Sequence, residues 1–522
     1  MDQLRQLWIP LRYSIFLALG VWLGAHYFAA NSSNSKSSYA DLDVIKSLIN
    51  DQYFDSLPKN FSFDEVAINK ALQTLDPFST YIPAKQTEEV NAPLEGSFVG
   101  IGVYFTMMHD TVYVEEVISG GPADLVQMKA GDRIIRVNGK NIAGIGMASD
   151  DVVKLLKGQD KTKVNVDIIR RGTANKTFTI TRGKVPIFSI DAAYLMDNST
   201  GYVRINKFSA TTGEEFTTAL KKLEKQGMKR LILDLRGNGG GFLSAAMEVA
   251  QQFLPANELV TFTQGLHTKK EELKTQNDGD FLNLPLKILI DEGSASASEI
   301  VAGALQDLDR AQILGRRSFG KGLVQGQFDL PSGAQLRLTV AKYYTPSGRC
   351  IQKDFSDMDA FELDVNKRFE NGEAFGKSQS PKGKAFKTKK GRTVYDGGGI
   401  SPDIFIPLDT SNYSNLWSTL LEKGTIVDFS DEYVNGNKSE LLKKYSNENS
   451  FVSNFQINDL LPNFMAYCKK NKVAWNEKEY RKSEKLITRY LFSQVGKKLF
   501  GQEVYIRVSN QFDPVIVKAL NQ

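Results

Sequence analysis

Short apolar runs alternate with amphipathic stretches through the middle of the chain. Residues 231–236, Leu-Ile-Leu-Asp-Leu-Arg, and 286–290, Leu-Lys-Ile-Leu-Ile, are mostly apolar without alternation. This is the pattern of strands that are buried on both faces of a sheet. Apolar positions at helix-like spacing follow each run, over residues 242–254 and 299–308. Strands that alternate with helices in this way predict an α/β domain.

The patterns on either side of this region are different. Strand-like runs separated by glycine turns dominate residues 97–183 and predict a β-rich domain. Residues 39–93 are polar with helix-like apolar spacing, and helical stretches recur beyond residue 409. One of them, residues 477–495, has apolar side chains on a single face: Leu486, Ile487, Tyr490, Leu491 and Val495. Such a face either packs on a neighbouring domain or mediates self-association.

Length and composition describe a multidomain globular protein. The 522 residues suffice for about three or four domains, and 41% hydrophobic with 24% charged residues is ordinary for folded domains. The net charge of +5 is small for this length, which does not favour nucleic-acid binding. Cys350 and Cys468 form no metal or disulfide spacing. We therefore expect neither a nucleic-acid partner nor a metal site.

An apolar segment near the N-terminus predicts attachment to a membrane. Residues 13–30 follow Arg5 and Arg12 and are just long enough to span a bilayer. The arginines before the segment and the Ser/Asn-rich stretch after it favour export of the rest of the chain. A cleaved signal peptide is the competing interpretation, but Phe28 stands where the cleavage motif needs a small residue. We favour an uncleaved signal anchor over residues 1–30.

The segment at residues 293–299, Gly-Ser-Ala-Ser-Ala-Ser-Glu, joins a predicted strand to a predicted helix. A serine on such a turn lies beside free helix N–H groups, which suits a nucleophile. None of the three histidines lies in a motif, so the candidate base is Lys321, which stands between two glycines. Burial of this lysine would favour its neutral amine. Alternatively, Ser296 is only a helix cap in a capping box with Glu299, and Lys321 is a surface residue.

A glycine cluster at residues 237–241 follows the first predicted strand. Backbone N–H groups in such a loop can bind an anion. The dinucleotide-binding fingerprint fails because Phe242 stands where its third glycine is required. A P-loop is excluded as well, since no Gly-Lys-Ser/Thr follows.

Residues 291–325 as a whole resemble the C-terminal processing peptidases, also called tail-specific proteases. In that family the middle serine of the run is the nucleophile, a later lysine is the base, and a glutamine orients the lysine. The matching positions here are Ser296, Lys321 and Gln325. The resemblance also implies a crotonase-like α/β core whose glycine loop donates to the oxyanion, and we assign the N–H groups of Gly241 and Ala297 as donors. It implies no metal and no organic cofactor.

Residues 97–183 resemble a PDZ domain. The motifs follow in order: Phe-Val-Gly-Ile-Gly-Val at 98–103, Gly-Pro-Ala at 121–123, and Gly-Asp-Arg-Ile-Ile-Arg-Val-Asn-Gly at 131–139. The resemblance implies a loop that presents N–H groups to a peptide carboxylate while the peptide extends the sheet. We predict that this loop consists of Val99, Gly100, Ile101 and Gly102.

These interpretations divide the chain into five parts: a signal anchor at 1–30, a helical region at 31–93, a PDZ domain at 97–183, a peptidase core at 185–408 and a helical extension at 409–522. A polar insertion at 354–396, absent from shorter family members, is expected to be a long solvated loop, with a lid or a partner contact as the alternative. Residues 343–349 match a family segment and form either a wall of the site or a simple turn.

The family resemblance implies a serine endopeptidase that recognises free apolar C-termini of proteins through its PDZ domain and cleaves near them. For a bacterial member with this anchor, it implies the inner membrane, with the catalytic domains in the periplasm. Other members need an activating partner or adaptor. A catalytically silent or partner-activated PDZ scaffold is therefore the alternative to a simple peptidase.

Overall fold

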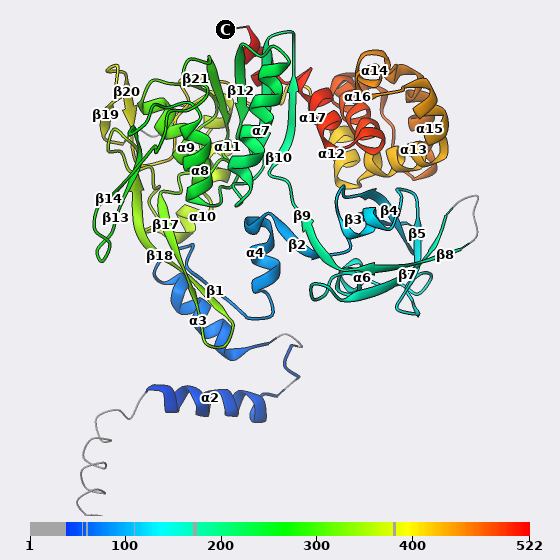
Figure 1. The fold of residues 1–522 in the computed structure, drawn as a ribbon, viewed down its shortest axis with the longest axis horizontal. Helices are drawn as coiled ribbons and strands as arrows, with labels where there is room; N and C mark the ends of the chain where they lie inside the picture. The colour runs from blue at the N-terminus through cyan, green and yellow to red at the C-terminus, as the bar shows by residue number, and fades with distance from the viewer. Residues whose placement is uncertain are drawn as a thin grey trace, which may run out of the picture. The chain divides into compact units, whose positions relative to one another are not determined.

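The computed structural model describes residues 38–54, 56–58, 61–108, 110–170, 175–378 and 383–521 (Figure 1). The chain forms two compact units that divide between Thr74 and Leu75. The predicted signal anchor at residues 1–30 lies outside the described residues. Within the ranges given above, no helix combines the length and the apolar character needed to cross a membrane.

Two helices, α2 (Ser38–Gln52) and α3 (Phe63–Gln73), make up most of the described part of the first unit. Ser62 caps α3 because its side chain accepts a hydrogen bond from the N–H of Glu65. Apolar side chains such as Leu48 on α2 remain exposed, and α3 has no buried residue. Among the side chains described in residues 41–73, the two helices therefore form no hydrophobic core of their own.

A six-stranded sheet forms the centre of the second unit. Its order is β10-β11-β12-β15-β16-β21, and neighbouring strands are parallel except for β10 and β11. The strands are β10 (Ile190–Leu195), β11 (Thr200–Ile205), β12 (Arg230–Asp234), β15 (Leu286–Ile290), β16 (Gln312–Gly315) and β21 (Ile404–Phe405). The predicted α/β core is confirmed.

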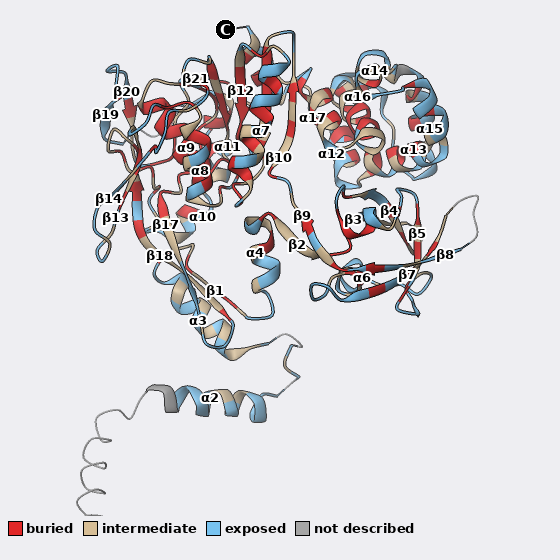
Figure 2. Cartoon of the chain, viewed as in Figure 1, coloured by how far each residue is buried: buried red, intermediate tan, exposed pale blue. Residues whose placement is uncertain are grey.

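Helices cover both faces of this sheet, which explains why its strands are apolar without alternation (Figure 2). Leu231 and Leu233 of β12 pack into the cluster on one face, and Ile232 between them packs into the cluster on the other. The covering helices are α7 (Thr212–Lys225), α8 (Leu243–Gln251) and α9 (Ala297–Asp307) on the first face, and α17 (Gln502–Asn510) and α18 (Pro514–Leu520) on the second.

The C-terminal extension is helical, as predicted. Before α17 it contains α12 (Asn415–Glu422), α13 (Thr425–Lys444), α14 (Glu448–Asn454), a 3-10 turn (Ile457–Asp459), α15 (Leu461–Lys470) and α16 (Glu477–Phe500). Ile487, Leu491 and Val495 of α16 are fully buried in the aromatic-rich core of the extension, on the face that the sequence predicts. Because α17 and α18 cover the peptidase sheet, the extension also completes the peptidase core.

A second sheet joins segments that lie far apart in the sequence. Its central strand, β18, pairs with β17, β13 and β1. The strands are β1 (Thr80–Ile82), β13 (Leu259–Gln264), β14 (Glu271–Lys274), β17 (Leu323–Asp329) and β18 (Gln335–Tyr344). Strand β1 therefore brings part of the predicted helical region at 31–93 into the peptidase core. The same region also contains helix α4 (Thr87–Glu95).

The PDZ region forms an antiparallel sheet in the order β3-β4-β5-β7-β8, with β6 paired to β5. Its elements are β3 (Val103–Met108), β4 (Thr111–Val117), α5 (Pro122–Leu125), β5 (Arg133–Val137), β6 (Lys140–Asn141), α6 (Ser149–Leu156), β7 (Lys163–Ile169) and β8 (Lys176–Thr181). A ribbon of β2 (Ser97–Gly100) and β9 (Gly183–Pro186) flanks it in the sequence. Among the described strands, β3 lies at an edge of this sheet.

The expectation of a long solvated loop at residues 354–396 is wrong. The segment contains α10 (Met358–Glu362), α11 (Asp364–Glu370), a 3-10 turn (Glu373–Phe375) and a hairpin of β19 (Ala385–Lys387) and β20 (Thr393–Tyr395). The polar composition of the segment suggests exposure to solvent, but two of its charged residues are buried in ion pairs. Glu373 pairs with Arg317, and Arg368 pairs with Asp364. The described residues of the insertion, 354–378 and 383–396, are a folded part of the peptidase core.

Candidate active site

Ser296 lies on the turn between β15 and α9 and is the N-cap residue of the helix. Its φ of 55° and ψ of −113° belong to a backbone region that non-glycine residues avoid. A strained strand-to-helix turn of this kind presents a hydroxyl beside the free N–H groups of the first helical turn. The turn thus has the geometry that a serine nucleophile needs.

A buried carboxylate joins this turn to residues 317–321, the lysine segment. Glu299, fully buried in the first turn of α9, accepts hydrogen bonds on Oε2 from the N–H groups of Ser296 at 2.9 Å and Lys321 at 2.8 Å. Its Oε1 accepts from the hydroxyl of Ser318 at 2.5 Å and the N–H of Gly320 at 2.7 Å. Burial raises the pKa of Glu299, and these four bonds to the ionised form oppose the rise. The predicted capping box is therefore one part of a larger network.

Tyr343 forms a second link between the same two segments. Its hydroxyl lies 2.5 Å from the carbonyl oxygen of Lys321 and 3.1 Å from that of Ser296. Burial raises the pKa of this phenol, so the hydroxyl remains a donor. Farther along the predicted segment, the N–H of Gly348 donates to the carbonyl of Thr345 at 2.8 Å and closes a turn. Residues 343–349 thus form both a wall between the two segments and a turn.

Lys321 is half-buried and is oriented by groups from two directions. Its Nζ donates to Oε1 of Gln325 at 3.1 Å and lies 4.2 Å from the ring centroid of Phe78. The amide nitrogen of Gln325 donates in turn to the carbonyl of Phe78 at 2.6 Å. Gln325 is thereby fixed with its oxygen toward the amine. Among the described residues, no hydrogen bond joins Lys321 Nζ directly to the hydroxyl of Ser296.

The environment of Lys321 favours its neutral form. Burial lowers the pKa of the amine, and the nearby Arg337 cation acts in the same direction. The carboxylates of Asp76 and Glu299 oppose this shift without cancelling it. A lysine whose pKa is lowered in this way can act as a base closer to neutral pH.

The glycine loop approaches the serine turn closely. A Cβ atom built on Gly240 would lie 2.8 Å from Ser296 Cβ and 3.0 Å from the backbone nitrogen of Ala297. The N–H of Gly240 donates to Asn238 Oδ1 at 2.8 Å. By contrast, the N–H groups of Gly241 and Ala297 have no acceptor among the described residues. The two predicted oxyanion donors are thus free to bind a ligand oxygen.

Replacing Gly240 by alanine is expected to lower the free energy of unfolding by about 1–3 kcal/mol, because the residue has a φ of +99° and its Cβ would contact the serine turn. Gly239→Ala is the control, since nothing lies within 4 Å of a Cβ at that exposed position. Urea unfolding of both variants measures the difference. Equal stability of the two would contradict the close packing of the loop.

The predicted carboxylate-binding loop of the PDZ domain comes directly before the edge strand β3. Val99 and Gly100 belong to the ribbon strand β2, and Ile101 and Gly102 follow it as irregular backbone. The carbonyls of Ile101 and Gly102 accept hydrogen bonds from Ala123 at 2.7 Å and Ile118 at 3.0 Å. Their own N–H groups donate to no residue in the described ranges. Two neighbouring N–H groups thus remain available at the start of an edge strand.

Sequence reasoning gave no role to Phe78 and Asp76, although both influence Lys321. Asp76 is buried, and its carboxylate accepts from the N–H groups of Phe78 at 2.8 Å and Ser79 at 2.9 Å. Its hydrogen bond from Thr339 at 3.0 Å ties this turn to β18. The Leu-Asp-Pro-Phe-Ser run contained the signal, because an aspartate two residues before the N–H that it binds is a common turn pattern.

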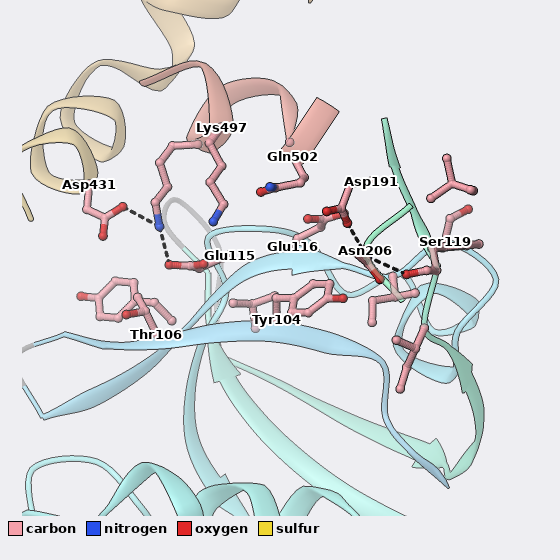
Figure 3. Close-up of a pocket in the computed structure, with 18 of the residues that line it drawn as sticks. Tyr104, Thr106, Glu115, Glu116, Ser119, Asp191, Asn206, Asp431, Lys497 and Gln502 are labelled. Carbon is pink, nitrogen blue, oxygen red and sulfur yellow. Dashed lines mark hydrogen bonds and ion pairs between the residues drawn. The ribbon is translucent and has the colours of Figure 1, made fainter. Parts of the chain in front are cut away.

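A cavity of about 780 Å³ lies away from these residues, between the PDZ strands β3 and β4 and the C-terminal helices (Figure 3). Tyr104, Thr106 and Gln502 line it. Lys498 links the two sides, with its Nζ 2.7 Å from Glu115 and 2.7 Å from Asp431. Neither Ser296 nor Lys321 lines this cavity, so it is separate from the candidate active site.

Family models match three parts of the chain. The model of peptidase family S41 matches residues 199–360, and a PDZ domain model matches residues 99–181. A family of unknown function (DUF8443) matches residues 416–501, within the helical extension.

The chain is also similar to individual proteases. The chain is 34% identical over 330 residues to a probable CtpA-like serine protease of Staphylococcus aureus (strain N315), covering 61% of this chain and 64% of that protein. It is 32% identical over 324 residues to the carboxy-terminal processing protease CtpA of Bacillus subtilis (strain 168), covering 62% of this chain and 68% of that protein. A photosystem II D1 C-terminal processing protease structure matches with a TM-score of 0.35 and 26% identity, over 71% of this chain and 87% of that one.

The predicted family resemblance is confirmed by these sequence matches. The chain spans 64% of the length of the Staphylococcus aureus protein and 68% of the Bacillus subtilis protein. The S41 match includes the four central strands β11, β12, β15 and β16, the turn that carries Ser296, and Lys321. The PDZ match covers most of the β-rich region. The chain therefore belongs to the C-terminal processing peptidases of family S41 and contains a PDZ domain.

Proposed function

We propose that the protein is a serine endopeptidase that binds free apolar C-termini of proteins through its PDZ domain and cleaves near them with Ser296 and Lys321. The observation that carries this proposal is the bonding of a single buried carboxylate, Glu299, to the backbone of both residues, at 2.9 and 2.8 Å. Such bonding holds a hydroxyl and a partly dehydrated amine in the same part of the core.

In the proposed reaction, neutral Lys321 accepts the hydroxyl proton of Ser296 as the serine oxygen attacks the carbonyl carbon of the scissile peptide. The resulting ammonium of Lys321 donates that proton to the leaving amine, and an ester of Ser296 remains. Lys321 then removes a proton from water as the water attacks the ester, and its ammonium returns this proton to the Ser296 oxygen when the new C-terminus leaves. Gln325 keeps the amine oriented through both steps.

The developing oxyanion would be stabilised by the N–H groups of Gly241 and Ala297. Both are without an acceptor among the described residues, and the loop that carries Gly241 packs against the serine turn. Loss of one such donor typically costs about 3–4 kcal/mol of transition-state stabilisation.

Substrate selection is assigned to the PDZ domain. The free N–H groups of Ile101 and Gly102 can donate to a terminal carboxylate, and the adjoining edge strand β3 can pair with the extended peptide. Extended protein segments therefore fit both the PDZ domain and the proposed peptidase, whereas small molecules do not use such an edge.

We also propose that residues 1–30 anchor the chain in a bacterial inner membrane with the folded units in the periplasm. This proposal rests on the apolar segment after Arg5 and Arg12. An activating adaptor and self-association are further proposals, supported by the family and by the exposed apolar helix faces of the first unit.

A partner-activated scaffold is the second candidate function. It is favoured by one observation, that no hydrogen bond joins Lys321 Nζ to the hydroxyl of Ser296 among the described residues. A partner or a bound substrate would then have to bring the two groups together before the first proton transfer.

The direct test incubates the full chain in detergent with an unfolded protein that ends in apolar residues, and with the same protein ending in two aspartates. Cleavage of the first substrate by the unmodified chain, absent in Ser296→Ala, would support the peptidase. Equal cleavage of both substrates would contradict C-terminal selection. No cleavage even with substrate in excess would favour the scaffold.

The pH dependence of cleavage is expected to follow the lysine. Activity should rise with pH until Lys321 is neutral, with a midpoint below the ordinary lysine pKa. Arg337→Gln removes a cation that lowers the pKa of Lys321, so the midpoint should move to higher pH. Arg337→Lys keeps the charge and is the control. An unchanged midpoint in Arg337→Gln would mean that Lys321 is not the titrating group.

A further inference from the structure

The folded insertion contributes a buried arginine to the backbone that leads to Lys321. Arg368 of α11 is 4% exposed. Its guanidinium donates to three successive carbonyl oxygens: those of Arg317 at 3.0 Å, Ser318 at 2.8 Å and Phe319 at 3.2 Å. The two remaining N–H groups donate to Asp364 at 3.1 and 2.8 Å. Every donor of this side chain is therefore used, and most of them bind the lysine segment.

The next carbonyls of the segment are satisfied as well. The N–H of Lys353 donates to the carbonyl of Gly320 at 3.0 Å, and Tyr343 donates to that of Lys321. On the donor side, the N–H groups of Gly320 and Lys321 bind Glu299. Hydrogen bonds thus fix consecutive residues of the backbone before the lysine, and Arg368 alone donates to three of the carbonyl oxygens.

A second residue of the insertion reaches the groups around the amine. The ring of Phe361, 7% exposed, makes edge contacts with Phe78 at 5.7 Å and with Phe319 at 6.1 Å between centroids. Phe78 is the residue whose ring lies against the Lys321 amine and whose carbonyl holds Gln325. Phe361 therefore packs directly behind the group that keeps water away from the amine.

We infer that the first part of the insertion, residues 354–378, is a positioning element for Lys321, with Arg368 fixing the backbone of the lysine segment and Phe361 supporting its apolar wall. This inference rests on the proposed role of Lys321 as the base. It assigns a role in the reaction to a segment with the composition of a solvent-exposed loop. Neither residue touches the reacting atoms, so both act through the position and the hydration of the amine.

Loss of Arg368 leaves three carbonyl oxygens in the protein interior without a hydrogen-bond donor. The lysine segment must then shift so that water can reach these oxygens. Water that reaches the lysine stabilises its ammonium form, so the amine becomes harder to deprotonate. A small displacement of the base also slows proton transfer more than it weakens substrate binding. The expected signature is a lower kcat, a nearly constant KM and a pH midpoint at higher pH.

The experiment compares the full chain with Arg368→Met and with Lys367→Met, an exposed neighbour on the same helix. Arg368→Met is expected to lower kcat by about 10- to 100-fold with KM within about threefold. It should also move the pH midpoint upward, whereas Lys367→Met should change neither. Arg368→Lys, which keeps the charge but cannot bind three carbonyls at once, should recover only part of the loss.

Phe361→Leu provides a milder second variant, because it keeps an apolar side chain and leaves the charges intact. It is decisive if Arg368→Met does not fold, as judged by near-ultraviolet circular dichroism. A midpoint that moves upward in Phe361→Leu supports the inference. A kcat and a midpoint equal to those of the unmodified chain, in this variant or in a folded Arg368→Met, would overturn it.

Labelling of Lys321 with acetic anhydride as a function of pH, followed by mass spectrometry, separates this inference from the proposed function. The labelling midpoint reports the protonation of the amine whether or not the chain cleaves anything. An upward shift in the variants of a chain that does not cleave supports the positioning role and counts against the peptidase. Cleavage with an unshifted labelling midpoint supports the peptidase and overturns the positioning role.

Discussion

Replacing Lys321 by methionine is expected to lower the rate of peptide cleavage by about 1,000-fold or more, with little change in stability. Methionine keeps the apolar stem against Phe78 but removes the amine that would accept the serine proton. Because the proposed mechanism has Ser296 and Lys321 act as a unit, the double variant with Ser296→Ala should be no slower than either single variant. Single-turnover cleavage of an unfolded protein with an apolar C-terminus measures all three.

Lys342→Met is the matched control, since Lys342 is an exposed lysine on β18. Its activity is expected to equal that of the unmodified chain. Additive losses in the double variant would mean that Ser296 and Lys321 act independently, and substantial activity in Lys321→Met would require another base.

Replacing Glu299 by glutamine is expected to lower the free energy of unfolding by about 3–5 kcal/mol and to impair cleavage at the same time. The carboxylate receives four donors, two on each oxygen, and an amide would put its own N–H₂ against two of them. The stability loss follows from these unsatisfied donors. The activity loss follows because the backbones of Ser296 and Lys321 lose their common partner.

Glu272→Gln on the exposed strand β14 is the control and should leave the urea midpoint unchanged. Chemical denaturation and cleavage are measured on the same preparations. A Glu299→Gln variant as stable as the unmodified chain would mean that the four donors find water, and that the carboxylate does not hold the site together.

The sequence predicts those helices and strands whose apolar residues follow the faces that are buried in the folded protein. Residues 286–290 are apolar except for Lys287 because β15 is covered on both faces, and the serine turn follows directly. The apolar face of α16 is recognisable for the same reason, since its residues share one helical stripe.

Other features depend on partners that are distant in the sequence. Strand β1 has three residues and is stabilised by pairing with β18, so no local period reveals it. The buried charges of Arg368 and Glu373 resemble solvated residues until their partners are known. Within the glycine loop, only the backbone conformation distinguishes Gly240, whose N–H is occupied, from Gly241, whose N–H is free among the described residues.

Helices α17 and α18 cover one face of the peptidase sheet, and they are synthesised after all of its strands. Ser296 leaves the ribosome long before these helices, so the nascent sheet has one apolar face uncovered. Arg236, directly before the glycine loop, also has to wait for Asp513, whose carboxylate accepts from its guanidinium at 2.7 Å. A growing chain therefore carries Ser296 before the sheet next to it is covered on both faces.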